Sequence, residues 1–333
     1  MMRGFSPERK GVVIATAGVV MVTPDAVLLR WASAAGGKLV AMTFWKCLLM
    51  GVVCGFYCER SAFASASRRI VACTAMGSLQ AVSIILLSYA FVYTYAATAV
   101  LCYSMHPLWS AVIGWVFLND VLPRRTIFAL VCAVLALFVM FAPEFVSGNF
   151  GGGRNSYGDA MAITTSLTMA LFLTSARAAS RVAPEISVPL ASSFGLLFAA
   201  AVLGVAATCA SASLAMPSFA FVAIAVDSLA VGAVNIAFSI APAYITAAQV
   251  GLISLVEAVF GPVWVFAIYG EVPPVFTIIG GVMIVAILAA HELTAPREER
   301  GKVPSPDDAD TGVPAYSPLA DDSEGATRDT ALP

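Results

Sequence analysis

The sequence predicts an all-α, polytopic membrane protein whose ten transmembrane helices form two inverted five-helix repeats. Three observations predict this fold: a very apolar composition, ten apolar runs long enough to span a bilayer, and a similarity between the two halves of the chain. Of 333 residues, 60% are hydrophobic and 11% are charged, whereas soluble domains average roughly 45–50% apolar and about 25% charged residues. Such a chain cannot build a water-facing surface, so we expect it to lie in the lipid bilayer.

The apolar runs are about 18 to 25 residues long, and a helix needs roughly 20 residues to cross about 30 Å of hydrocarbon. Lipid offers the backbone no hydrogen-bond partner, and the runs lack the alternation of barrel strands, so the spans are expected to be helices. The first run is expected to be a retained span because no cleavage site ends a short apolar core. The expected spans are 11–31, 39–58, 70–91, 94–118, 125–142, 157–177, 187–209, 218–241, 245–269 and 275–293.

The positive charges between the spans predict the orientation, because cytoplasmic loops keep an excess of Lys and Arg. With ten spans, fourteen Lys and Arg lie on the side of the N-terminus and three, Arg30, Lys38 and Arg154, lie on the opposite side. The remaining cation, Lys46, lies inside a span. Both termini are therefore expected in the cytoplasm, while the membrane itself, plasma or organellar, is left open.

The chain is expected to divide into five segments: a cytoplasmic N-terminus 1–10, a first repeat 11–142, an inter-repeat loop 143–156, a second repeat 157–293 and a tail 294–333. The tail holds six prolines and nine acidic residues, so it cannot bury enough apolar surface to order itself and is expected to be disordered. The internal loops are too short for a soluble catalytic domain, and the sequence has no Gly-x-x-x-x-Gly-Lys-Ser/Thr phosphate loop. Transport driven by its own ATP hydrolysis is therefore not expected.

An internal repeat appears when the sequence is shifted by 151 residues. Residues 88–139 then align with 239–290 without a gap, and 14 of the 52 pairs are identical, including Tyr93 with Tyr244 and Pro123 with Pro274. Each half holds five spans, an odd number, so the second half must enter the membrane from the opposite side. Inverted repeats of this kind are typical of secondary transporters, which bind their solute near the midplane between the repeats.

Short motifs occur at several places in both halves. They are Pro107-Leu108, Leu118-Asn119-Asp120, Leu255-Val256-Glu257-Ala258-Val259, Tyr269-Gly270-Glu271, Tyr157-Gly158-Asp159 and Phe44-Trp45-Lys46. With these motifs the sequence resembles the drug/metabolite transporter superfamily with two EamA-type domains. It departs from the family pattern at Lys46, where Arg is usual, at Asn119-Asp120, which stands for Gly-Glu, and at Ala258, which stands for Pro.

The resemblance implies a central cavity lined by the fourth and ninth helices. Members of the superfamily carry amino acids, nucleotide sugars, drugs and other metabolites, so the resemblance indicates the fold and does not identify the solute.

Two titratable residues at mid-span are the first candidates for function, because a charge at mid-bilayer costs at least about 2.5–3.5 kcal/mol on the translocon scale. His106 and Glu257 lie at the centres of the fourth and ninth spans, and they are 151 residues apart, so they occupy equivalent positions. We expect them to meet near the pseudo-two-fold axis and to bind a polar group of the solute or take up a proton. The alternative is structural: Glu257 bonds to neighbouring backbone, and His106 occupies a packed polar site.

The other candidates carry hydroxyl, amide or charged groups within the spans. On the fourth and ninth spans these are Tyr93, Tyr103, Ser104, Tyr244, Gln249 and Ser254. Hydrogen bonds between helices, or an aromatic belt at the interface, are the alternative for each. Asn235 can border the cavity, although a structural role is favoured for it and for Asp227. Asp25 follows Pro24, where a broken helix would expose carbonyl groups, and Lys46 either pairs with an acid or extends to an interface.

The sequence thus favours a secondary transporter that moves a small metabolite by alternating access at a mid-membrane cavity. A channel, an intramembrane enzyme and a membrane scaffold or regulator are the alternatives. The sequence lacks the nucleophile with its base, or the His-Glu-x-x-His metal set, that an enzyme needs. We expect no cofactor, no metal and no nucleic acid; the expected partners are a small-molecule solute and the lipid bilayer, with proton or ion coupling and the oligomeric state left open.

Overall fold

The computed structural model describes residues 7–57, 70–94, 96–120, 122–142, 156–183, 186–270 and 272–293. These residues form helices and short connections, with no strand among them, which confirms the all-α class. The predicted tail, most of the predicted inter-repeat loop and the first six residues lie outside the described part of the chain.

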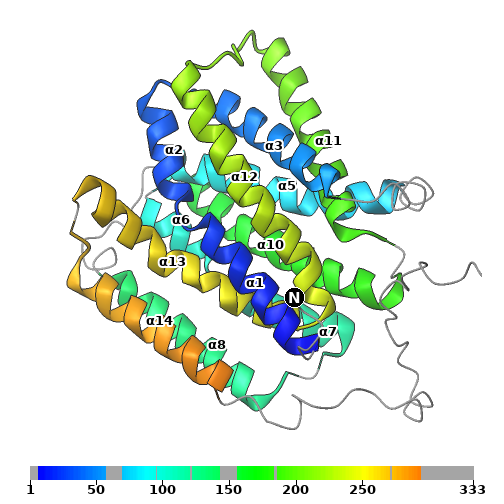
Figure 1. Ribbon diagram of the computed structural model, residues 1–333, viewed down its shortest axis with the longest axis vertical. Helices are drawn as coiled ribbons and strands as arrows, with labels where there is room; N and C mark the ends of the chain where they lie inside the picture. The colour runs from blue at the N-terminus through cyan, green and yellow to red at the C-terminus, as the bar shows by residue number, and fades with distance from the viewer. Residues whose placement is uncertain are drawn as a thin grey trace, which may run out of the picture.

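The helices pack side by side in one bundle (Figure 1). In chain order they are α1 (Pro7–Val22), α2 (Asp25–Ala34), α3 (Leu39–Phe56), α5 (Ile70–Tyr93), α6 (Ala96–Tyr103), α7 (His106–Leu118), α8 (Arg124–Met140), α10 (Ser156–Val182), α11 (Val188–Cys209), α12 (Ser218–Ile240), the 3-10 turn η1 (Ala241–Ala243), α13 (Ala247–Tyr269) and α14 (Val275–Leu293).

Each predicted span coincides with a helix or a pair of helices. Within the described residues, eight helical segments are long and apolar enough to cross a membrane. The fifth predicted span is α8, with 17 residues, and the tenth lies in α14, whose apolar stretch Val275–His291 is shorter than the other eight spans. A helix of 17 residues is at the lower limit for crossing the hydrocarbon core.

Two spans are broken, and proline explains both breaks. The break between α1 and α2 at Pro24 was expected, whereas the predicted continuous span 94–118 is instead two helices, α6 and α7, which meet at Ser104 and Met105. Proline has no amide hydrogen for the carbonyl four residues earlier and disfavours helical geometry in the residue before it. The sequence analysis did not use Pro107 in this way.

At each break, the side chain of the residue before the proline forms a hydrogen bond to the carbonyl group that lacks its usual backbone donor. Thr23 Oγ1 donates to the carbonyl oxygen of Val20 at 2.9 Å, the acceptor that the amide of residue 24 would reach in a regular helix. The imidazole Nδ1 of His106 lies 2.9 Å from the carbonyl oxygen of Tyr103, the acceptor that residue 107 cannot reach. Both carbonyl groups therefore keep a donor, which matters in a bundle that lipid surrounds.

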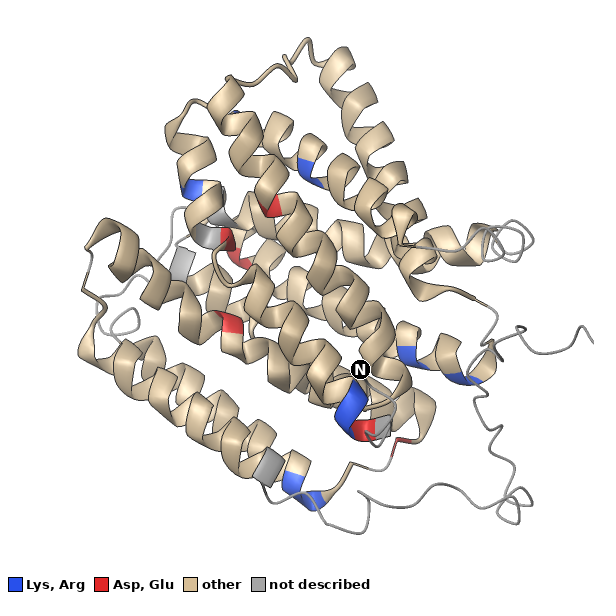
Figure 2. Ribbon diagram, viewed as in Figure 1, with Lys and Arg blue, Asp and Glu red and all other residues tan. Residues whose placement is uncertain are grey.

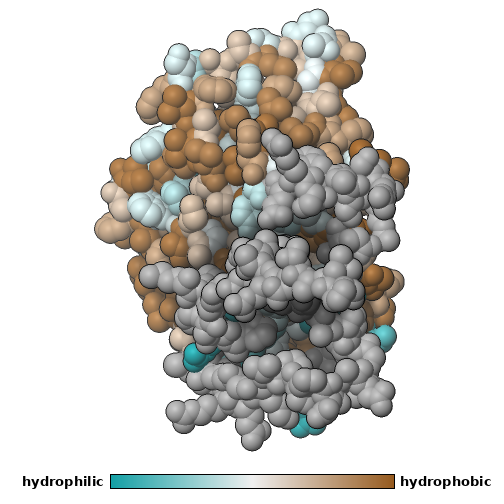
Figure 3. All heavy atoms as spheres, turned by 45° about the vertical axis from the view of Figure 1, so that its right-hand side comes forward, coloured by the Kyte–Doolittle hydropathy of each residue, from teal (hydrophilic) through white to brown (hydrophobic). Residues whose placement is uncertain are grey.

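The helix contacts pair elements of the two halves of the chain. α5 packs against α10 and α11, α3 packs against α11 and α12, and α1 packs against α12 and α13. α7 lies against α10 and α13, and α8 lies against α14 at one side of the bundle (Figure 1). The outer faces remain apolar: Trp115 is 67% exposed and Phe117 is 76% exposed, and Figure 3 shows apolar side chains over much of the described surface on one face. That surface suits lipid contact.

Glycines allow the closest helix approach, between α5 and α11. A Cβ added at Gly77 would lie 1.9 Å from the carbonyl oxygen of Ala191, and one added at Gly195 would lie 2.0 Å from the carbonyl carbon of Gly77. The Gly51-x-x-x-Gly55 pair likewise packs inside the chain, where a Cβ at Gly51 would lie 2.9 Å from Leu197 of α11. Small residues at such crossings are typical of membrane helices.

Basic side chains gather at one end of the bundle, near the start of α1 (Figure 2). There Arg125 pairs with Glu8 at 3.3 Å, and Arg177 and Arg181 pair with Asp120. We call this the basic end. The other end, which carries the connection 35–38 and residues 272–274, is called the far end.

Candidate functional site

A cavity of about 1000 Å³ extends from the far end to the middle of the bundle. Ser33, Gly37 and Pro273 line it near the far end, and His106 and Glu257 line it at mid-bundle. Apolar side chains such as Leu29 and Phe141 separate the polar groups along its walls. Ligand sites commonly enclose about 300–1000 Å³ and combine apolar walls with a few placed polar groups, so this cavity has the volume and lining of a small-molecule site.

Seven of the eleven candidate residues line this cavity. They are Asp25, Lys46, Tyr103, Ser104, His106, Ser254 and Glu257. Asn235 lines a smaller adjoining hollow of about 70 Å³, which shares Asp25, Lys46, Tyr103 and Glu257 with the cavity. The structure therefore brings most of the sequence candidates together around one cavity.

Three candidates lie away from the cavity. Tyr93 is 39% exposed and stacks on Tyr89 with ring centroids 6.5 Å apart. Gln249 caps the start of α13. Its backbone amide donates to Thr246 Oγ1, and its side-chain Oε1 accepts from the backbone amide of Thr246 at 2.8 Å. Tyr244 precedes this cap and lies against Gly11 of α1. All three residues are therefore set apart from the lining of the cavity.

Lys46 lies between two carboxylates contributed by different helices. Its Nζ donates to Asp25 Oδ1 at 2.7 Å and lies 2.8 Å from Asp227 Oδ2, a contact that lacks the geometry of a directed hydrogen bond. Asp25 begins α2, where the helix dipole favours a negative charge. Lys46 therefore pairs with an acid, one of its two predicted alternatives, and Asp227 has the structural role that was favoured for it.

His106 is 1% exposed and connects α7 to α13. Its Nδ1 must donate to the Tyr103 carbonyl, and its Nε2 lies 2.9 Å from Ser254 Oγ. Ser254 Oγ also lies 2.6 Å from the carbonyl oxygen of Gly251. A hydroxyl has one hydrogen, so two arrangements are possible. If His106 is neutral, Ser254 Oγ donates to His106 Nε2. If His106 is protonated, Nε2 donates to Ser254 Oγ, and Ser254 donates to the carbonyl oxygen of Gly251. Both protonation states of His106 fit these positions.

Glu257 lines the cavity and the adjoining hollow and has no hydrogen bond or ion pair with any described residue. Its predicted bonding to neighbouring backbone is therefore not seen within the described part of the chain. His106 and Glu257 line the same cavity, as expected, but they do not pair: His106 bonds to Ser254, one helical turn before Glu257. A carboxyl group that faces a cavity without a protein partner is available to a solute or a proton.

Two further polar residues at the site were missed in the sequence. Gln80 of α5 donates from Nε2 to Asn235 Oδ1, and both side chains are buried. A single amide side chain in the middle of an apolar span was the sequence signal that could have indicated Gln80. The guanidinium of Arg30 lies 4.2 Å from the centre of the Tyr269 ring, and Arg30 also lines the cavity. A charged residue at the end of the first predicted span was the sequence signal that could have indicated Arg30.

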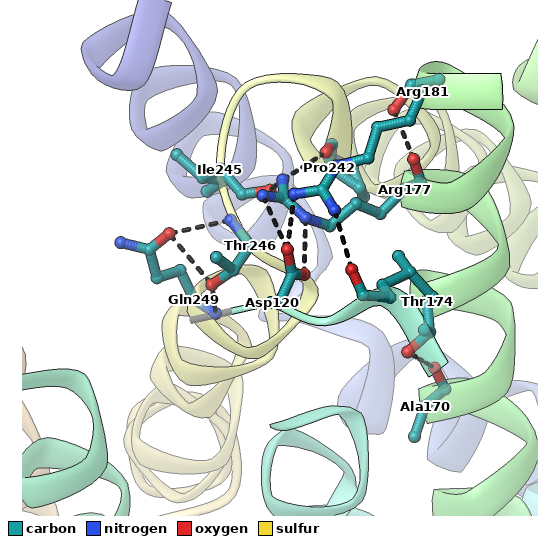
Figure 4. Close-up of polar contacts among 11 residues, drawn as sticks. Asp120, Ala170, Thr174, Arg177, Arg181, Pro242, Ile245, Thr246 and Gln249 are labelled. Carbon is teal, nitrogen blue, oxygen red and sulfur yellow. Dashed lines mark hydrogen bonds and ion pairs between the residues drawn. The ribbon is translucent and has the colours of Figure 1, made fainter. Parts of the chain in front are cut away.

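Asp120, from the Asn119-Asp120 motif, lies outside the cavity and joins three segments at the basic end (Figure 4). Arg177 Nε donates to Asp120 Oδ2 at 2.8 Å, and Arg177 Nη1 donates to the carbonyl oxygen of Pro242 at 3.0 Å. Arg177 also donates to the carbonyl of Ile245, and Arg181 pairs with Asp120 Oδ1. The carboxylate of Asp120 is 5% exposed. The end of α7, the end of α10 and the η1–α13 connection are thus held together opposite the cavity mouth.

Comparison with known proteins now adds to the geometry. Residues 9–142 match the model of the EamA-like transporter family. Within these residues the chain is similar to an EamA-like domain. This match covers the predicted first repeat, 11–142, and confirms the resemblance to the drug/metabolite transporter superfamily. Together with the apolar helices, it indicates an integral, multi-pass membrane protein.

A solved structure, described only as the crystal structure of a protein, is similar to this chain with a TM-score of 0.67. Its sequence is 15% identical, and the match covers 86% of this chain and 99% of the other. At that identity the likeness concerns the fold alone. A comparison with curated proteins gave no match.

Proposed function

We propose that this protein is a secondary transporter that moves a small solute through the central cavity by alternating access. One observation carries the proposal: the cavity reaches from the far end to mid-bundle, while ion pairs and helix contacts close the basic end. A channel needs a path that is continuous between both ends, so the one-sided cavity favours a carrier. The match to the EamA-like transporter family supports transport over catalysis or a scaffold role.

Matching contacts in the two halves support an inverted repeat. Thr126 Oγ1 of α8 lies 3.2 Å from His291 Nε2 of α14, and Thr277 Oγ1 of α14 donates to the carbonyl oxygen of Met140 of α8 at 3.2 Å. Thr126 and Thr277 are 151 residues apart, and so are Met140 and His291. Exchanging the two halves therefore maps one contact onto the other.

Helix starts in the two halves support the same relation. A Cβ added at Gly11 would lie 2.8 Å from Tyr244 Cβ and 3.0 Å from Ile245, and one added at Gly158 would lie 2.6 to 2.8 Å from backbone atoms of Tyr93 and Thr94. The two partner pairs are again 151 residues apart. The first span therefore packs on the start of the ninth as the sixth packs on the start of the fourth.

The charge distribution gives the proposed orientation. Arg125, Arg177 and Arg181 lie at the basic end, so the preference of cytoplasmic loops for Lys and Arg assigns that end, with both termini, to the cytoplasm. The cavity then opens to the non-cytoplasmic side. Labelling of the two termini on opposite faces of the membrane would contradict this orientation and the two-repeat arrangement with it.

The charges in the cavity narrow the proposed solute. Lys46 is already held by Asp25 and Asp227, whereas Glu257 has no basic partner among the described residues. A nucleotide sugar needs several cations for its phosphate groups, and the described lining of this cavity has only one cation beyond the paired Lys46, Arg30, near the mouth. Neutral or cationic solutes with an apolar part, including amines and amino acids, fit the lining better. Glu257 would bind the cationic group or exchange it for a proton.

Flux into proteoliposomes tests the proposal. Purified protein is first screened by thermal shift against quaternary amines, amino acids and nucleotide sugars, and the stabilising compounds are then tested for saturable uptake and counterflow. We expect Glu257→Gln to abolish uptake, and the matched carboxyl substitution Glu8→Gln, at the basic end, to retain it. Normal uptake by both Glu257→Gln and His106→Ala at every pH would refute the roles of these residues.

A further inference from the structure

The ninth span and its equivalent in the fourth span have opposite environments. Shifting by 151 residues places Pro107, Ser110 and Gly114 of α7 opposite Ala258, Gly261 and Val265 of α13. The three α13 residues line the cavity. Their three equivalents in α7 are buried and lie outside the cavity. One helix is therefore exposed to the cavity at the positions where its counterpart is packed.

Two contacts close α7 against α13 at the inner end of the cavity. His106 Nε2 lies 2.9 Å from Ser254 Oγ. One turn further, a Cβ added at Gly251 would lie 2.9 Å from the Cα and 3.0 Å from the Cβ of Pro107, so the two backbones touch. Only a glycine at position 251 permits this approach.

The equivalent pairs line the cavity. Shifted by 151 residues, His106 with Ser254 becomes Glu257 with Tyr103, and Pro107 with Gly251 becomes Ala258 with Val100. All four of these residues line the cavity, and no hydrogen bond joins Glu257 to Tyr103. Tyr103 and Val100 belong to α6, so the fourth span packs on α13 through α7 and presents the equivalent residues of α6 to the cavity.

Asp120 adds a second layer to the closed side. A Cβ added at Gly114 would lie 3.5 Å from Asp120 Oδ2, so the packed face of α7 is next to the carboxylate that binds Arg177 and Arg181. The sequence equivalent of Asp120 is Glu271, which lies outside the described residues. The ion pairs of Asp120 must break before α7 can leave α13 at the basic end.

We infer that the fourth span, α6 with α7, and α13 form two equivalent gates that close in turn. The basic gate consists of His106 with Ser254 and Pro107 with Gly251, and the far gate consists of Glu257 with Tyr103 and Ala258 with Val100. This inference rests on the proposed function. In the opposite state the Tyr103 hydroxyl donates to the Glu257 carboxylate, Val100 packs on Ala258, and the Asp120 ion pairs are broken. Tyr103 and Ser254 are therefore positioning residues for the two titratable groups.

Ser110 and Gly261 report which gate is closed. They are equivalent positions, cysteine is close in size to Ser110, and a Cβ at Gly261 would meet no atom within 4 Å. In full-length protein whose seven cysteines have been replaced, Ser110→Cys and Gly261→Cys are introduced separately and labelled with a charged methanethiosulfonate reagent. We expect Gly261→Cys to react faster than Ser110→Cys, because only Gly261 lines the cavity.

The decisive variant is Asp120→Asn, which weakens the pairs with Arg177 and Arg181 and keeps the side-chain shape. It should raise the labelling rate of Ser110→Cys and lower that of Gly261→Cys, each by at least about five-fold, the lower end of typical coupling between two sites. Glu8→Gln, which removes the separate ion pair with Arg125, is the control and should change neither rate. If Asp120→Asn does not fold, Gly251→Val replaces it, since the added side chain wedges the basic gate open.

Two outcomes overturn the inference: unchanged rates at both positions, or a rise at Ser110→Cys without a fall at Gly261→Cys, which would mean that the basic end has only loosened. The labelling needs no solute, so it separates the inference from the proposed function. Reciprocal rates without uptake of any solute would support the gates and refute transport. Saturable uptake without reciprocal rates would support transport and refute the gates.

Discussion

The imidazole of His106 occupies the place of the amide hydrogen that Pro107 lacks. Its Nδ1 lies 2.9 Å from the carbonyl oxygen of Tyr103, so the proline that breaks the fourth span also fixes the ring of the histidine. With Nδ1 used in this way, Nε2 is directed toward Ser254. A backbone defect thus determines which ring nitrogen of His106 can exchange a proton with its surroundings.

The first prediction concerns the stability of this break. His106→Ala should lower the free energy of unfolding by about 1–3 kcal/mol, because the carbonyl of Tyr103 and the hydroxyl of Ser254 lose a buried partner. Thermal unfolding in detergent measures the change. Thr23→Val, at the equivalent break before Pro24, should have an effect in the same direction, since it removes the bond to Val20 and the partner of Trp264 Nε1. A wild-type melting temperature for both variants would show that these side chains do not support the breaks.

The second prediction concerns the ion cluster around Lys46. Lys46→Met should destabilise the protein by about 3–5 kcal/mol, because it leaves the carboxylates of Asp25 and Asp227 without their cation in a buried site. Lys46→Arg keeps the charge and should be the mildest substitution, as the family pattern indicates. Adding Asp227→Asn to Lys46→Met should restore part of the loss, which a double-mutant cycle on thermal unfolding would detect. Strictly additive effects would show that the two residues do not interact.

The third prediction concerns the crossing of α5 and α11. Gly77→Ala should destabilise the fold by at least about 1–3 kcal/mol, the usual effect of overpacking, because the new Cβ would lie 1.9 Å from the backbone oxygen of Ala191. Gly261→Ala is the matched control, since its Cβ meets nothing within 4 Å. Expression and melting temperature in detergent measure both. Equal tolerance of the two substitutions would contradict the close approach.

The fourth prediction concerns the two tyrosines of the fourth-span region. Tyr103→Phe should reduce solute uptake about ten-fold or more, because Tyr103 lines the cavity and is the proposed partner of Glu257. A ten-fold reduction corresponds to the loss of about 1.4 kcal/mol of interaction free energy. Tyr93→Phe should leave uptake unchanged, since Tyr93 lies outside the cavity on Tyr89. Initial rates of uptake into proteoliposomes compare the two. Equal rates would remove Tyr103 from the site.

Hydropathy predicted most of the helices, because lipid forces each apolar run of sufficient length into a helix. Residue spacing also placed His106 and Glu257 in one cavity. Sequence spacing could not predict that His106 would bond to Ser254 while Glu257 stayed unpaired, since that difference depends on which side of the bundle is closed. Sequence spacing likewise did not name the acids that pair with Lys46 or the arginines that pair with Asp120, because helix packing brings these residues together.

The three candidates that lie away from the cavity were selected by residue type and span alone. Tyr93, Tyr244 and Gln249 were selected because they carry polar groups on the fourth and ninth spans. All three lie near helix ends, where unpaired backbone groups and neighbouring chains compete for such side chains. Depth along a span, and not membership of it, separates them from Tyr103 and Ser254.

The pair formed by α8 and α14 behaves differently from α7 and α13 under exchange of the halves. Its two threonine contacts, Thr126 with His291 and Thr277 with Met140, are both present in one conformation. The contacts between α8 and α14 are therefore the same after the halves are exchanged, so neither helix has to slide past the other. In the proposed alternating access, the cavity changes sides while these two helices remain a fixed support, against which the remainder of the bundle rocks.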